Sequence, residues 1–373
     1  MKTKKTDIVY CALFCGFLAV MLVLFLVLPK TDFSEKEKRY LQESPELSWN
    51  NVLSGQYGED VESYIADHVP GRDFFVGLSA YYDLLSGRQV AKDIYAAQGD
   101  RLVEAPVKQD QEAIRRNMSF INAFAEKTGA QVDLMIVPSA GYINRNAVRG
   151  LADPYRDDAI LQVIYQEAGA NVRPVELLSV FEGAENPEDL YYRTDHHWTS
   201  LGAYTAYERY MDFLGREKAD RDAFKVERTG GFYGTTYARS GLWLTKSEDV
   251  ELWKTDGAFT VTNENGTPHE GLFYEERLQE LDKYTVYLDG NHSLVTIENP
   301  ENAGKGSLLV IRDSYANCLG TFLAHSYERV VLVDLRYYKQ PVSELLAAGE
   351  FSDVLVCYSL SNFMTDANFP WLK

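Results

Sequence analysis

The stretch GSLLVIRDSYANCLGTFLAH, residues 306–325, joins an apolar run directly to a helical pattern. The run SLLVI does not alternate polar and apolar residues, which is typical of a strand buried on both faces of a sheet. Asp313 and Ser314 follow the run, and the helical pattern begins at once. A strand followed directly by a helix is the repeating unit of an α/β fold with a parallel sheet.

The same alternation recurs on both sides of this stretch. Helices are expected at about 155–168, over YANCLGTFLAHS and VSELLAAGE, and over 110–129, where Gly129 stands at a C-cap position. We therefore predict a doubly wound α/β sheet with parallel pairing. The further buried strands are expected at QVDLMIVP (131–138), NVRPVEL (171–177), RVVLVDL (329–335) and DVLVCYS (353–359).

Between about residues 218 and 300 the composition changes. Segments such as GGFYGTTYARSGLWLT and YTVYLDGNHSLVTIE are rich in Gly, Tyr, Thr and Asn. This texture is typical of short strands and loops, and we interpret it as a β-rich insertion on the sheet.

The N-terminus predicts a membrane anchor. Ile8 to Leu28 contain no charged residue, and a helix of that length spans roughly 30 Å, about one hydrocarbon core. The lysines of MKTKK precede the run and an acidic chain follows it, which favours an N-terminus inside and a body outside. A cleaved signal peptide is the alternative, but the run is long and LVLPKTDF lacks a small-x-small cleavage pattern.

These features divide the chain into successive segments. Residues 57–86 read as two helices joined by a turn at Pro70-Gly71. The expected segments are a cytoplasmic N-terminus (1–7), a transmembrane anchor (8–28), a stalk and helical segment (29–91), and a catalytic domain (92–373) that carries the insertion.

The composition excludes some partners. The formal net charge of −18 would repel a phosphate backbone, so no nucleic acid is expected. Cys11 and Cys15 lie in the anchor, and Cys318 and Cys357 are either two buried free thiols or a disulfide. The sequence has no CxxC or Cys/His zinc spacing and no GxGxxG, GxxxxGK[ST], HExxH or GxSxG motif, so neither a cofactor nor a metal is expected.

Asp313-Ser314 lies where an open parallel sheet binds ligands, at the carboxyl end of a strand. A serine at this turn can direct its hydroxyl into the crevice. Free N–H groups of the first helical turn can stabilise an oxyanion. The alternative is that Asp and Ser merely cap the helix.

The motif TDHHW supplies the groups that such a serine needs. Asp195 and His197 are separated by one residue, which allows a carboxylate to orient an imidazole base. A buried histidine satisfied by a neighbouring acid is the alternative. A metal held by Asp195, His196 and His197 is a weaker interpretation, because adjacent histidines diverge and no further ligand is evident.

With TDHHWTSLGAY, the chain resembles the DHHW proteins, which are similar to alginate O-acetyltransferases of the SGNH-hydrolase-like group. GRDFF, VPSAGY, FYGTTYARSG, LDGNH, IRDSYAN and VDLRYY extend the resemblance over most of the chain after the anchor. The resemblance implies a three-layer α/β/α fold.

It also implies that Asp195 and His197 act as acid and base and Ser314 as nucleophile. This chain order reverses that of ordinary SGNH hydrolases, whose serine comes first. Arg312 stands where the usual Gly-Asp-Ser has glycine, and no C-terminal carbohydrate-binding module is visible. The remaining candidates for oxyanion or substrate contacts are Asn291, Arg336, Tyr337, His196, Trp198 and Asp313.

The expected activity is acetyl transfer through a serine ester onto a cell-envelope or exopolysaccharide glycan, outside the cytoplasm. Because acetyl-CoA is cytoplasmic, the resemblance implies a membrane-bound O-acyltransferase partner that passes acetyl groups across. A carbohydrate acetyl esterase and a non-catalytic glycan-binding or scaffold protein remain alternatives.

Overall fold

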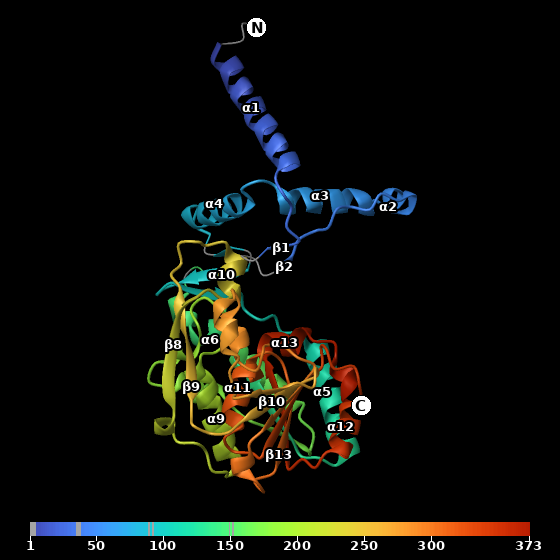
Figure 1. Cartoon of the computed structure of the whole chain (residues 1–373), viewed down its shortest axis with the longest axis vertical. Coiled ribbons are helices and arrows are strands. Elements are labelled where there is room, and N and C mark those ends of the chain that lie inside the picture. Colours follow the sequence, from blue (N-terminus) through green and yellow to red (C-terminus); the bar gives the residue numbers. More distant parts are fainter. Residues whose placement is uncertain (1–4, 35–38, 89, 92, 149, 151–152) are drawn as a thin grey trace. The chain divides into compact units, whose positions relative to one another are not determined.

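The structure, a computed structural model, describes residues 5–34, 39–88, 90–91, 93–148, 150 and 153–373 (Figure 1). The first lysines of MKTKK lie outside the described residues. The chain forms two compact units. The first comprises Met1–Ala91 with Ala238–Leu244, and the second comprises Lys92–Tyr237 with Thr245–Lys373.

The second unit is built on an eight-stranded sheet with the order β11-β10-β12-β14-β13-β15-β6-β7. Its last five strands are parallel, and the three contributed by the insertion are antiparallel. The strands are β6 (Val132–Val137), β7 (Val172–Pro174), β10 (Thr260–Asn263), β11 (Pro268–Glu270), β12 (Leu294–Glu298), β13 (Ser307–Arg312), β14 (Arg329–Asp334) and β15 (Asp353–Ser359).

Helices cover both faces of the sheet. Val310 of β13 packs into a core shared with α9 (Ser200–Leu214) and α11 (Tyr315–Leu323). Its neighbours Leu309 and Ile311 pack into a second core. This alternation along a strand buried on both faces confirms the three-layer α/β/α fold. The second core is shared with α5 (Gln111–Thr128), α7 (Asp157–Gln166), α12 (Val342–Ala348) and α13 (Leu360–Thr365).

Local sequence signals set the helix ends. Asp110 accepts hydrogen bonds from two backbone N–H groups at the start of α5, and Gly129 ends that helix in the left-handed conformation at φ 69°. Thr199 caps α9 in the same way through the N–H of Gly202. The cap fixes the direction in which the chain leaves the TDHHW loop and enters α9.

The insertion extends the main sheet, because β12 pairs antiparallel with β14 and continues the sheet to β10 and β11. A separate hairpin pairs β8 with β9. The other strands of this unit are β4 (Ile94–Ala97), β5 (Arg101–Glu104), β8 (Lys225–Phe232) and β9 (Glu248–Lys254), and its other short helices are α6 (Ala140–Ile143) and α8 (Leu178–Glu182). Helix α10 (Thr235–Ser240) begins in this unit and ends in the first. The 3₁₀ turns are η1 (Arg145–Ala147), η2 (Pro187–Leu190), η3 (Arg221–Ala223), η4 (Glu275–Gln279), η5 (Lys283–Val286), η6 (Pro300–Asn302) and η7 (Phe369–Leu372).

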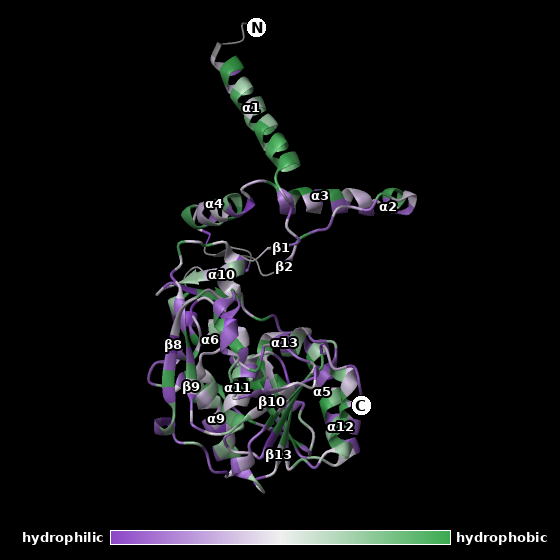
Figure 2. Cartoon of the chain, in the orientation of Figure 1, coloured by the Kyte–Doolittle hydropathy of each residue, from purple (hydrophilic) through white to green (hydrophobic). Residues whose placement is uncertain are grey.

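The first unit is mainly helical. Its helix α1 (Lys5–Val27) is apolar after its first turn (Figure 2), and Thr6–Val27 is long and apolar enough to cross a membrane. Gly71, at φ 73°, makes the turn after Pro70 that separates α3 from α4. The other elements are β1 (Phe33–Ser34), β2 (Arg39–Tyr40), α2 (Trp49–Ser54), α3 (Gln56–His68), α4 (Arg72–Leu85) and β3 (Val90–Ala91).

Candidate active site

A continuous hydrogen-bond chain joins the three residues proposed for catalysis. The Nδ1 atom of His197 lies 2.5 Å from Oδ1 of Asp195, and its Nε2 atom lies 2.8 Å from Oγ of Ser314. All three side chains are buried. With the Nδ1 proton donated to Asp195, Nε2 is free to accept the proton of the serine hydroxyl. The fold thus brings together the serine, the base and the orienting acid.

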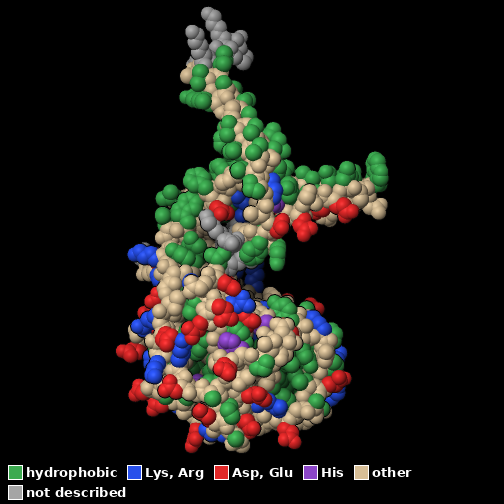
Figure 3. All heavy atoms as spheres, in the orientation of Figure 1, with side chains coloured by type: hydrophobic (Ala, Val, Ile, Leu, Met, Phe, Trp, Pro, Cys, Tyr) green, Lys and Arg blue, Asp and Glu red, His purple; other side chains and the backbone are tan. Residues whose placement is uncertain are grey.

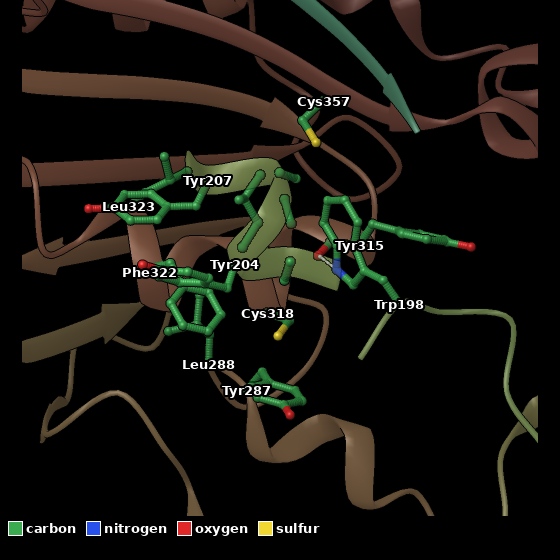
Figure 4. Close-up of a cluster of buried hydrophobic side chains, with 14 of the residues drawn as sticks. Trp198, Tyr204, Tyr207, Tyr287, Leu288, Tyr315, Cys318, Phe322, Leu323 and Cys357 are labelled. Carbon is green, nitrogen blue, oxygen red and sulfur yellow. Dashed lines mark hydrogen bonds between the residues drawn. The ribbon is translucent and has the colours of Figure 1, made fainter. Parts of the chain in front are cut away.

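The TDHHW loop is clamped to the helix that begins after Ser314. The indole N–H of Trp198 donates to the backbone carbonyl of Tyr315 at 3.0 Å, and Figure 4 shows the two rings packed together. In return, the Tyr315 hydroxyl donates to the backbone carbonyl of His196. The two bonds hold the residues on either side of His197 to Tyr315, the residue that follows Ser314, and so they limit how far His197 can move from Ser314.

A threonine outside the predicted set holds the other carboxylate oxygen of Asp195. Oδ2 accepts hydrogen bonds from the backbone N–H of Thr235 at 2.7 Å and from its hydroxyl at 3.0 Å. A Cβ atom at Gly234 would collide with the side chain of Asp195, so glycine is needed for this close approach. Glu248 supports the loop by accepting from both the N–H and the hydroxyl of Thr194.

Two aromatic rings border the imidazole of His197. The ring of Tyr284 is stacked on it with a centroid distance of 3.9 Å and an interplanar angle of 9°. The ring of His196 lies 3.8 Å away on centroids, and its Nδ1 is paired with the Thr235 hydroxyl. Burial, and next the charge of His197, lower the pKa of His196, so its neutral form is favoured.

The N–H groups at the start of α11 are mostly occupied. The N–H of Tyr315 donates to the carboxylate of Asp313, and those of Ala316 and Asn317 donate to backbone carbonyls. The N–H of Ser314 has no partner among the described residues. The first turn therefore offers one free donor beside the serine hydroxyl, fewer than a bare helix N-terminus would offer.

Asn291 is placed beside the same turn. Its Oδ1 atom accepts from Nη1 of Arg312 at 3.1 Å and from Nδ2 of Asn317 at 3.2 Å, one turn beyond Ser314. Its own amide N–H groups have no protein acceptor within the described part of the chain. Three preceding residues, Leu288 to Gly290, all have positive φ, between 56° and 81°. Such backbone strain is concentrated at functional sites.

Comparison with known proteins identifies the family of the chain. Residues 104–333, more than half of the chain, match the DHHW protein family. The chain belongs to that family. A comparison with curated proteins gives no match.

Solved structures similar to this DHHW chain share its fold. A DHHW family protein from Eubacterium siraeum is 23% identical, with 76% of this chain and 95% of that chain covered and a TM-score of 0.67. Bacillus cereus PatB1 with a sulfonyl adduct is 21% identical, with 75% and 98% covered and a TM-score of 0.63. The O-acetyltransferase domain of Pseudomonas putida AlgJ is 14% identical, with 75% and 95% covered and a TM-score of 0.46.

Arg312 occupies a buried position behind the serine of the DHHW chain. Its guanidinium lies 3.4 Å from the carboxylate of Asp334 and donates to the carbonyl of His292 at 3.3 Å. Arg336 also binds Asp334, at 2.6 Å. Arg312 and Arg336 therefore share one buried carboxylate, which gives Arg312 a charged partner at the position that glycine holds in the usual Gly-Asp-Ser.

The other candidates lie in different surroundings. Trp198 is fully buried, and Asp313 is buried with its Oδ2 bonded to the Ser359 N–H and to Asn362. Both positions suit a structural role. Arg336 is held by Asp334, whereas Tyr337 next to it is exposed.

Asp195, His196 and His197 have ligand atoms within 4.8 Å of one another, a spacing that could hold a metal ion. Each is already engaged, since Asp195 pairs with His197 and His196 pairs with Thr235. A metal would have to break these bonds.

Cys318 and Cys357 are buried free thiols, and burial raises the pKa of Cys318 to about 12. Both stay protonated near neutral pH, which disfavours nucleophilic chemistry at either sulfur.

Proposed function

We propose that this protein is an extracytoplasmic O-acetyltransferase that moves an acetyl group through an ester of Ser314 onto a cell-envelope or exopolysaccharide glycan. The observation that carries the proposal is the hydrogen-bond chain from Asp195 through His197 to Ser314, with distances of 2.5 and 2.8 Å. Both distances are within the reach that proton transfer requires.

In the first half-reaction, Oγ of Ser314 attacks the carbonyl carbon of an acetyl donor while Nε2 of His197 takes the hydroxyl proton. Asp195 stabilises the imidazolium. The N–H of Ser314 and the amide of Asn291 donate to the tetrahedral oxyanion. The intermediate collapses by breaking the bond to the leaving group, which takes the proton from His197. Serine is left as its acetyl ester.

In the second half-reaction, His197 removes the proton of a sugar hydroxyl as its oxygen attacks the ester. Collapse of this intermediate returns the proton to Oγ of Ser314 and releases the acetylated sugar. A positioned base supplies roughly 10²–10⁴-fold of the acceleration, and one oxyanion donor about 10²–10³-fold.

The charges that flank α1 support the proposed location. The lysines of MKTKK favour an N-terminus inside and a catalytic unit outside the cytoplasm, and the long apolar run without a small-x-small pattern favours an uncleaved anchor. Acetyl-CoA is then out of reach. The proposed donor is a membrane-bound O-acyltransferase partner that carries acetyl groups across the membrane.

The proposal is tested with a chromogenic acetyl ester and with a sulfonyl fluoride, which reacts with an activated serine. The wild type should release acetate and gain one sulfonyl group on the peptide containing Ser314. Ser314→Ala should lose both reactions. Ser343→Ala, which truncates a buried serine of α12 among the residues of the other core, is the matched control and should keep both.

Adding an oligosaccharide as acetyl acceptor distinguishes an acetyltransferase from an acetyl esterase. A transferase should divide the acetyl group between water and added oligosaccharide, so the yield of acetylated sugar rises with sugar concentration. An esterase should release free acetate at a rate that sugar does not change. A protein that neither turns over the ester nor takes the sulfonyl label would be the non-catalytic scaffold.

A further inference from the structure

An apolar stripe runs along the exposed face of α4. Phe74, Leu78, Tyr82 and Leu85 recur at helical spacing, and Tyr82 and Leu85 are 70% and 88% exposed. Side chains at i, i+4, i+8 and i+11 share one face of a helix. Phe75, 40% exposed, widens the stripe. Contiguous exposed apolar side chains of this kind mark an interaction surface.

Apart from Phe74, the stripe lies away from the face by which α4 packs within its own unit. That face carries the buried residues Gly77 and Ala80. The indole of Trp243 lies so close to Gly77 that a Cβ atom there would collide with it, and the same indole stacks on Phe74 at 5.8 Å. The core contact of α4 is therefore already made, on a different side of the helix from Leu78, Tyr82 and Leu85.

A second apolar face lies on α2. Trp49 and Leu53, at i and i+4, are 82% and 83% exposed, with Val52 exposed between them. None of the six residues of α2 is buried. Figure 3 shows apolar side chains gathered along α2 and along α4. We call these exposed residues the apolar surface: Trp49, Val52, Leu53, Phe74, Phe75, Leu78, Tyr82 and Leu85.

Chain continuity indicates what covers this surface. The unit that carries it begins with α1, whose Thr6–Val27 stretch is long enough to cross a membrane. Between Val27 and Trp49 lie 21 residues, so α2 is tethered near the bilayer that α1 enters. Two of the most exposed members, Trp49 and Tyr82, are of the residue types enriched at membrane–water interfaces.

We propose that the apolar surface lies in the interfacial layer of the phospholipid bilayer that α1 spans. The inference rests on the anchoring proposed above and goes beyond the catalytic function. Interfacial helices bury an apolar face about 5–10 Å into the boundary between headgroups and acyl chains while their polar face stays in water. Asp73 and Asp83 of α4 lie away from the stripe, as this arrangement requires.

The natural tryptophans test the proposal. The chain has five, and α1 contains none, so the anchor contributes no tryptophan emission. Trp49 belongs to the apolar surface, and Trp243, 39% exposed, stacks on its member Phe74. Trp198 and Trp253 are buried. The full-length chain is reconstituted into phosphatidylcholine vesicles whose acyl chains carry bromine near the glycerol end. Emission is then compared with that in unbrominated vesicles, and flotation with the vesicles is measured in parallel.

We expect brominated lipid to quench part of the emission, and we expect Trp49→Phe to remove the larger part of that quenching. Trp371→Phe is the matched control, because Trp371 is 37% exposed in the other unit, and it should leave the quenching unchanged. Phenylalanine keeps an aromatic ring at each position, which protects the fold.

Two outcomes would overturn the proposal. A chain that floats with the vesicles but shows no bromine quenching places the apolar surface against protein, such as a second copy. Quenching that remains unchanged when Trp49→Phe and Trp243→Phe are combined has the same meaning, because Trp243 stacks on Phe74 of that surface. If the chain does not float with the vesicles, α1 is not a membrane anchor, and the proposed position of the apolar surface is also wrong. Hydrolysis of a soluble acetyl ester by the same samples reports separately on Ser314, so failure of the surface proposal and failure of the catalytic proposal are distinguishable.

Discussion

The phenol ring of Tyr284 lies parallel to the imidazole of His197, with ring centroids 3.9 Å apart. The Tyr284 hydroxyl is buried, and no described residue hydrogen-bonds to it. Tyr284 therefore contributes a flat apolar wall and no proton. The wall excludes water from one face of the base and limits rotation of the imidazole away from Ser314.

This arrangement predicts different results for two substitutions of Tyr284. Tyr284→Phe keeps the wall and removes an unpaired buried hydroxyl, so activity should persist and the melting temperature should stay or rise. Tyr284→Ala opens a cavity, which should cost about 3–5 kcal/mol of stability, and should lower kcat. Ester hydrolysis and thermal unfolding check both. Equal loss of kcat in the two variants would contradict the packing role.

The Thr235 hydroxyl should assist Asp195 measurably. Thr235→Val removes the 3.0 Å hydroxyl bond to Asp195 and the contact of the same hydroxyl with Nδ1 of His196, but it keeps the 2.7 Å backbone bond to Asp195. We therefore expect a partial loss of kcat with little change in KM. Thr236→Val is the control, because the hydroxyl of Thr236 is buried and has no hydrogen-bond partner among the residues that the structure describes. Steady-state ester hydrolysis tests the pair, and an intact kcat in Thr235→Val would remove the hydroxyl from the mechanism.

Asn291 should act in the transition state more than in substrate binding. Asn291→Ala should lower kcat roughly 10²–10³-fold with a small effect on KM, as loss of one oxyanion donor does. Asn265→Ala, on the exposed turn between β10 and β11, is the control and should behave as wild type. A change confined to KM would instead assign Asn291 to substrate binding.

Arg312 should act through Asn291. Arg312→Met removes one of the two donors to Oδ1 of Asn291 and leaves only the bond from Asn317, so the Asn291 amide is held less firmly, while Arg336 continues to bind Asp334. We expect kcat to fall in the single variant, and we expect little further fall when Arg312→Met is added to Asn291→Ala. Such non-additivity is the signature of two residues in one network. Additive losses would show that Arg312 acts by another route.

Asp157 predicts a pH dependence of stability. Burial raises the pKa of this carboxyl to about 6, from an unfolded value near 3.8. The folded state then holds its proton more tightly, so the group destabilises the fold progressively as pH rises from about 4 through 6. Compared with Asp157→Asn, the wild type should lose up to about 3 kcal/mol between those limits. Urea unfolding at several pH values measures this, and a pH-independent difference would contradict it.

The sequence predicted the sheet because strands buried on both faces leave a plain signature. SLLVI, RVVLVDL and DVLVCYS contain few polar residues, and helix signals such as Gly129 separate the layers. The sequence could not predict the edge at which the insertion joins. That edge depends on β12 pairing with β14. The residue types of a strand do not determine which other strand its backbone pairs with.

The same limit applies to the site. Asp195, His197 and Ser314 stand in the short motifs TDHHW and IRDSYAN, and their residue types are those of a serine nucleophile with its base and acid. The sequence alone therefore allowed us to predict them as candidates. Thr235 is 40 residues from Asp195 and is a common residue type. Tyr284 is one of 25 tyrosines. Only tertiary packing distinguishes such neighbours from the rest, so sequence reasoning missed them together with Gly234 and Glu248.

The order of the reactive groups along the chain has a consequence for biosynthesis. His197 and Ser314 are 117 residues apart, and the base is made first. The nucleophile joins it only after the insertion and β13 have been synthesised and folded into place. Contacts between such distant residues form late. A ribosome-bound chain that ends before Ser314 therefore holds the imidazole of His197 without its serine, and the hydrogen bond between them forms only after β13 and α11 have folded.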